Sequence, residues 1–137
     1  MESSNPARST IDVVSTMIDI LKLELNIRLE DNFTIFRIED YKQWITNLTL
    51  VEEKIQLLSD MPTFSSAKVK LTELKGMVHH MVYVVSLKLY VYSVLTHHEE
   101  LSTWLALTNR MQEIVNVLYR TLESKTSLHV FGATKTD

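Results

Sequence analysis

The chain has 137 residues, with 17 acidic and 14 basic side chains and a net charge of −3. It contains no cysteine, which excludes a disulfide framework, a zinc site made of thiolates and a cysteine nucleophile. Two glycines and two prolines leave few positions for tight turns, so an all-β fold and a glycine-rich phosphate-binding loop are disfavoured. The composition predicts a single all-α domain in a reducing compartment.

Residues 1–8 are polar and include Pro6, and we expect them to be disordered. They lack the basic and apolar segments of a secretory signal, which predicts a cytoplasmic or nuclear protein. A helix is expected from Ser9 or Thr10, whose side chains can cap it. Its apolar residues recur at the spacing of a helix that packs on another helix. They are Ile11, Val14, Ile18, Leu21 and Leu25.

Residues 23–38 have an ambiguous pattern. Apolar and polar residues alternate from Leu23 to Leu29, and a second apolar segment follows the turn-like residues 30–32, as in a β-hairpin. A two-stranded hairpin is marginally stable by itself in water. The preferred prediction is therefore a first helix that continues to about Leu29, and the alternative is a short hairpin or extended segment over 23–38.

A second helix is expected to open at Glu39 and Asp40 and to end before Pro62. A third is expected from about residue 66 to residue 95. Its stretch 76–95 is apolar on nearly every side, which predicts a central helix buried by the other three. The resulting fold is a bundle of four main helices.

A fourth helix is expected after Thr96, because Thr96 and Glu99 have the spacing of a capping box. No glycine or proline occurs from Met77 to Phe131, so the alternative is one rod over 66–123, as in an extended coiled coil. The bundle domain is predicted over 9–123, with a mostly disordered tail over 124–137. No internal repeat at a solenoid period is evident, which indicates one core.

The sequence contains no motif that predicts chemistry. His79, His80, His97 and His98 are metal-ligand types, but adjacent histidines on a helix point about 100° apart and cannot face one ion. No nucleophile elbow is present. We therefore predict no enzyme, no metal and no cofactor. The ionisable residues His79, His80 and Lys88 also argue against a membrane span over 76–95.

The predicted function is a protein-protein interaction module, a scaffold, adaptor or assembly subunit that acts through apolar helix faces. Its expected partner is a second copy of the chain, most simply in a homodimer, or another helical protein. One alternative is a Bcl-2-like groove that captures an amphipathic helix. The other is a helical nucleic-acid binder that uses Lys68, Lys70 and Lys75. The interface candidates are Trp44, Tyr83, Tyr90, Tyr92, Trp104 and Met111.

Overall fold

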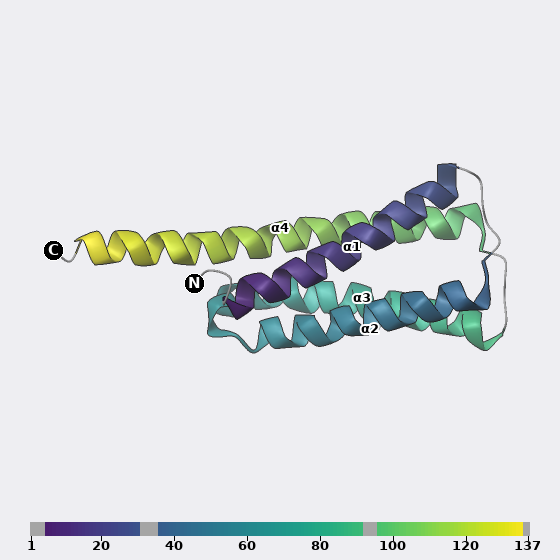
Figure 1. Cartoon of the computed structure of the whole chain (residues 1–137), viewed down its shortest axis with the longest axis horizontal. Coiled ribbons are helices and arrows are strands. Elements are labelled where there is room, and N and C mark those ends of the chain that lie inside the picture. Colours follow the sequence, from purple (N-terminus) through teal and green to yellow (C-terminus); the bar gives the residue numbers. More distant parts are fainter. Residues whose placement is uncertain (1–4, 31–35, 92–95, 136–137) are drawn as a thin grey trace.

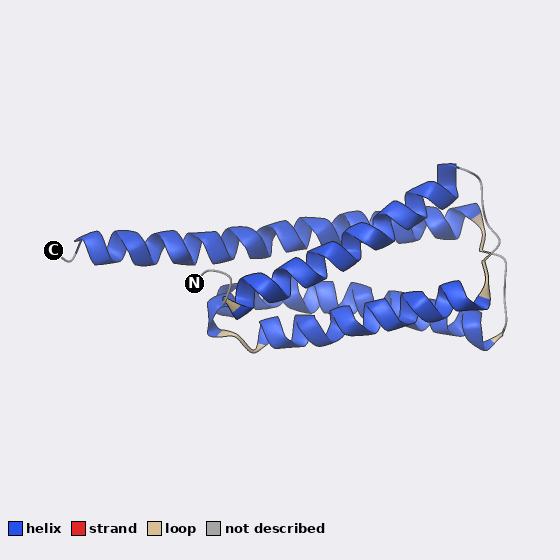
Figure 2. Ribbon diagram, in the orientation of Figure 1, coloured by secondary structure: helices blue, strands red, loops and turns tan. Residues whose placement is uncertain are grey.

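The computed structural model describes residues 5–30, 36–91 and 96–135, with side chains up to residue 125. These residues contain four α-helices and no strand, so the predicted all-α bundle is confirmed (Figures 1 and 2). The helices are α1 (Pro6–Glu30), α2 (Ile38–Ser59), α3 (Lys68–Tyr90) and α4 (His98–Lys135). A 3-10 segment, η2 (Pro62–Ala67), joins α2 to α3. Successive helices run in opposite directions, and α4 extends past the other three at the end of the bundle where α1 begins (Figure 1).

Helix α1 begins earlier than the sequence pattern predicted. The Asn5 side chain accepts hydrogen bonds from the backbone N–H groups of Ala7 (2.9 Å) and Arg8 (3.3 Å). Pro6 then occupies the first helical position, where its missing N–H group costs nothing. The predicted disorder of residues 1–8 is therefore wrong for residues 5–8, and residues 1–4 lie outside the described part of the chain.

Residues 23–30 belong to α1, which confirms the preferred helix and not the hairpin. The apolar residues that alternate with polar ones in this segment do not share one face of the helix. Leu25 is buried, whereas Leu23 and Ile27 point to solvent. Residues 36 and 37 precede α2 without regular secondary structure, and the backbone of Arg37 is extended, whereas residues 31–35 lie outside the described ranges.

The segment predicted as a central helix lies at one corner of the bundle. Helix α3 ends at Tyr90, and α4 begins at His98 and turns back on the bundle, so the continuous rod over 66–123 is wrong and the break is confirmed. The predicted burial on every side is also wrong, because each helix of a four-helix bundle has two neighbours and one open face. Helix α3 buries one face, made of Leu71, Leu74, Val78, Met81 and Val85.

Helix α4 continues to Lys135, so the predicted disorder of the tail is wrong for residues 124–135, and residues 136–137 are outside the description. No proline interrupts this segment, and α4 passes through Gly132, because one glycine inside a helix costs only about 1 kcal/mol. A single hydrophobic core joins all four helices, as predicted. Among the described residues, every buried side-chain nitrogen and oxygen atom has a hydrogen-bond partner.

The two helical hairpins, α1–α2 and α3–α4, follow one pattern displaced by 60 positions. Every buried residue of α1 and α2 has a buried counterpart 60 positions later, with no insertion or deletion. In α1 and its counterpart these are Ala7, Ile11, Val14, Ile18, Leu21 and Leu25, then Ala67, Leu71, Leu74, Val78, Met81 and Val85. In α2 and its counterpart they are Tyr41, Trp44, Leu48, Val51, Ile55 and Leu58, then Leu101, Trp104, Thr108, Met111, Val115 and Leu118.

The polar contacts that join the helices of each hairpin are repeated as well. Arg28 at the end of α1 pairs with Asp40 at 3.1 Å, and Lys88 at the end of α3 pairs with Glu100 at 2.8 Å. Both acids also accept a hydrogen bond from the backbone three residues earlier. The same side-chain chemistry thus starts α2 and α4.

The packing of the hairpins matches an approximate two-fold axis between them. The most extensive contacts are α1 with α4 and α2 with α3, which are the same contact when the hairpins exchange places. The equivalent tryptophans, Trp44 and Trp104, meet edge to face with ring centroids 5.8 Å apart. The chain therefore contains a repeat, at a period longer than that of solenoid proteins.

The burial of α3 predicts the effect of a charge in the core. Val85 is fully buried, so Val85→Asp places an unpaired carboxylate among apolar residues, and we expect it to lower the free energy of unfolding by several kcal/mol. Lys68→Glu changes an exposed residue of the same helix and should be nearly neutral. Urea unfolding of both variants checks this. Similar midpoints for the two would contradict the burial of Val85.

Candidate interaction surface

Aromatic rings close the end of the bundle where α2 and α4 begin. Phe36 is buried, and its ring lies 5.5 Å from that of Tyr41 and 5.2 Å from that of Trp44. The Arg28 guanidinium covers the Phe36 ring at 4.2 Å. Phe36 therefore joins the end of α1 to the start of α2 and to the contact between the hairpins.

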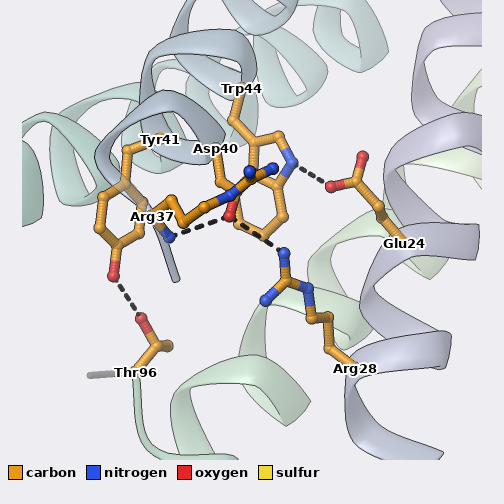
Figure 3. Close-up of polar contacts among 7 residues, drawn as sticks. All are labelled: Glu24, Arg28, Arg37, Asp40, Tyr41, Trp44 and Thr96. Carbon is orange, nitrogen blue, oxygen red and sulfur yellow. Dashed lines mark hydrogen bonds and ion pairs between the residues drawn. The ribbon is translucent and has the colours of Figure 1, made fainter. Parts of the chain in front are cut away.

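Each polar group of this cluster has a partner (Figure 3). Trp44 donates its indole N–H to Glu24 at 2.7 Å, and the hydroxyls of Tyr41 and Thr96 share a hydrogen bond of 2.9 Å. Asp40 binds both Arg28 and the backbone of Arg37. The predicted capping box of Thr96 and Glu99 is absent, because the Thr96 hydroxyl turns to Tyr41. The arrangement ties α1, α2 and the start of α4 together.

Asp40 and Glu100, the capping acids of α2 and α4, have lowered pKa values. Burial by itself would raise the pKa of Asp40, but the hydrogen bonds from the Arg37 backbone and from Arg28 outweigh it. The pKa of Glu100 is also lowered, because Lys88 and the His97 backbone overcome the effect of burial. Both carboxylates stay ionised and bound at neutral pH, which is the behaviour of structural ion pairs.

The histidines are dispersed over the bundle. His79 contacts Glu52 of α2 at 3.0 Å, while His97 and His98 lie at the start of α4. Within the described residues, no group of three metal-ligand side chains comes together.

The predicted interface candidates separate into two groups. Trp44, Trp104 and Met111 are buried in the core. Their positions on apolar helix faces are consistent with this core role. Tyr83 and Tyr90 are exposed on α3, and Tyr92 lies outside the described residues. Among the five candidates that the structure describes, only the two exposed tyrosines are placed where a partner can reach them.

The exposed tyrosines belong to a longer apolar row. We call Tyr83, Leu87, Tyr90 and Val91 the α3 stripe; these side chains are 59%, 46%, 82% and 64% exposed. Their spacing places Tyr83, Leu87 and Tyr90 on successive turns of one face of α3, and Val91 is the C-cap of this helix. Leu87 and Val91 were missed as candidates, because the surrounding segment is so apolar that its solvent-facing residues resemble core residues.

A second exposed row lies on α1 and was also missed. We call Ile20, Leu23 and Ile27 the α1 stripe; they are 47%, 61% and 50% exposed. The sequence did contain a signal for this row, because it has apolar residues beside the core positions Ile18, Leu21 and Leu25, more than the core face needs. By contrast, the outer faces of α2 and α4 are polar among the described side chains, with Leu57 the one large exposed apolar residue.

A groove between α1 and α2 adjoins the α1 stripe. It is lined by Met17, Ile20, Leu21, Trp44, Leu48 and Val51, with Glu24 and Asn47 at its edge. The side chains nearly fill it and leave space for about one water molecule. An amphipathic helix would have to open this groove before it could insert an apolar side chain.

The three lysines proposed for nucleic acid lie at the start of α3. Lys68 is exposed, Lys70 is 3.8 Å from Glu73, and Lys75 donates a hydrogen bond to Gln56. Glu73 also binds Arg110 of α4 at 2.6 Å. The basic groups of this region are therefore mixed with an acid.

Comparisons with known proteins give no assignment: no family model, curated protein or solved structure matches the chain. In the described residues, no helix is both long enough and apolar enough to cross a membrane.

The capping acids predict a dependence of stability on pH. Their pKa values are lower in the folded than in the unfolded chain, so their stabilisation is complete above the unfolded values of about 4 and is lost as the pH falls through the folded values. We expect the variant Asp40→Asn/Glu100→Gln to be less stable than the wild type at pH 7, and the difference to shrink by pH 3.

Thermal unfolding at the two pH values measures this difference. The matched control is Glu39→Gln/Glu99→Gln, which changes the neighbouring exposed acids at equivalent positions of the two hairpins. A difference between wild type and Asp40→Asn/Glu100→Gln that stays constant from pH 7 to pH 3 would show that the two ion pairs do not stabilise the fold.

Proposed function

We propose that the protein is a non-enzymatic assembly module that binds a second copy of itself through the α3 stripe. The observation that carries this proposal is the exposure of four large apolar side chains, three along the last turns of α3 and one at its C-cap, Val91. Scattered exposed apolar residues are ordinary, but a contiguous row marks a surface that a partner covers.

The chemistry of the stripe suits protein recognition. Tyr83 and Tyr90 can bury a ring against a partner while the hydroxyl group remains in water, and tyrosine is enriched among the residues that contribute most to binding. Leu87 and Val91 lie between and beside them and add apolar contact area. A face of this kind supports association with another apolar helix face.

The contrast with the outer faces of α2 and α4 also supports the choice of this face. The outer faces of α2 and α4 carry polar side chains, as expected for surfaces that remain in water. The groove between α1 and α2 is nearly filled, so a surface row is a better docking site than a helix-binding groove.

The experiment is a measurement of mass in solution by sedimentation velocity over a range of protein concentrations. We expect the wild type to associate as the concentration rises. The variant Tyr83→Glu/Leu87→Glu should remain a folded monomer, because its two carboxylates would be buried without partners in the interface.

The control is Val69→Glu, which introduces one carboxylate at another exposed apolar position of α3, 81% exposed and far from the stripe. It should associate like the wild type. A wild type that stays monomeric, or a Tyr83→Glu/Leu87→Glu variant with unchanged mass, would refute the proposal.

A further inference from the structure

The two exposed stripes occupy equivalent positions in the repeat. Leu23 of α1 corresponds to Tyr83 of α3, and their exposed fractions are 61% and 59%. Ile27 corresponds to Leu87, and their exposed fractions are 50% and 46%. Each hairpin therefore presents a large apolar pair at the same place on its first helix.

Core packing explains the matching buried residues but not these exposed pairs. Neighbouring outward positions differ between the hairpins, as Ile20 and His80 do, or Glu30 and Tyr90. A solvent-facing residue is free to be polar without loss of stability. The persistence of apolar side chains at both exposed positions in both hairpins points to a shared docking role.

The bundle directs the two surfaces away from each other. Helices α1 and α3 each pack on α2 and α4, which places them at opposite corners of the bundle. They run in the same direction, so both stripes lie towards the end that carries the α1–α2 and α3–α4 connections (Figure 1). One partner helix cannot cover both stripes, and one chain can therefore hold two neighbours.

Acidic side chains of the same helix flank the α1 stripe but not the α3 stripe. The α1 stripe is accompanied by the acids Asp19, Glu24 and Glu30, while the two basic residues of this stretch, Lys22 and Arg28, bind Gln112 and Asp40 of neighbouring helices. Helix α3 has no acidic residue from Lys75 to Tyr90, and its stripe is accompanied by His79 and His80. An α1 stripe placed on another α1 stripe brings acids together, whereas an α1 stripe on an α3 stripe brings acids opposite imidazole groups and tyrosine hydroxyls.

We infer that the α1 stripe of one copy docks on the α3 stripe of the next copy, so that each chain is bivalent. This inference rests on the proposed function and identifies the surface on which the α3 stripe docks. Such a contact is heterologous, because its two sides are different surfaces of the chain, and it builds rows or rings, not a closed dimer.

Each single contact should be weak. Helix residues 16–30, which carry the α1 stripe, span about 21 Å, so one helix laid on another buries less than the roughly 800 Å² per partner of a stable complex. Association is therefore expected to rise gradually with concentration and to pass beyond the dimer.

Two variants matched through the repeat test the inference. One is Leu23→Glu/Ile27→Glu, which disables the α1 stripe, and the other is Tyr83→Glu/Leu87→Glu, which disables the α3 stripe at the equivalent positions. All four side chains are exposed, so both variants should keep the helical circular dichroism and unfolding temperature of the wild type. The uncharged variants Leu23→Gln/Ile27→Gln and Tyr83→Gln/Leu87→Gln replace them if either charged variant is unfolded.

Sedimentation velocity is measured for each variant alone and for an equimolar mixture. We expect each variant alone to be monomeric, because one of the two surfaces is missing from every copy. The mixture should form a heterodimer and stop there, because the intact α1 stripe of one variant meets the intact α3 stripe of the other.

Other results separate the two proposals. If only the α3 variant becomes monomeric, the proposed function stands and the inference is overturned. If each variant dimerises by itself, α1 stripes pair with α1 stripes and α3 stripes with α3 stripes, and the proposed heterologous contact is wrong. If both variants keep the wild-type mass, or the wild type is monomeric throughout, the inference and the proposed function both fail.

Discussion

The bundle depends on the contact between its two hairpins, across which Trp44 and Trp104 meet. Each hairpin has an apolar face that it cannot cover by itself, and the other hairpin covers it. The equivalent tryptophans meet edge to face at 5.8 Å, and Phe36 packs against Trp44 to close the adjoining end. The ion pairs of Arg28 with Asp40 and of Lys88 with Glu100 hold the two helices of each hairpin together near this contact.

The helices could be predicted from the sequence because their signals are local. The spacing of Ile11, Val14 and Ile18 and the acids at the start of α2 are enough to place α1 and α2. The start of α1 also had a local signal, an asparagine followed by a proline, but the polarity of the segment obscured it. The degree of burial of α3 could not be predicted, because it depends on how many neighbours the helix has.

The repeat was obscured by substitutions of different chemical class. Tyr41 corresponds to Leu101 and Leu48 to Thr108, so a comparison of residue types along the chain finds little similarity. Burial makes the correspondence visible, because a position can stay buried while its side chain changes. The α1 stripe was missed for a related reason: whether Leu23 faces solvent is decided by the placement of the neighbouring helices.

The pairing of α1 with α4 has a consequence for the growing chain. Helix α1 is made first, but the helix that covers much of its apolar face is made last; Asp12 binds Tyr119, 107 positions away. Helices α2 and α3, which are neighbours in sequence, can pair as soon as α3 has been synthesised. During synthesis, the native cover of this face of α1 is therefore missing until α4 has left the ribosome, and α1 reaches its final packing through the contact of highest sequence separation in the bundle.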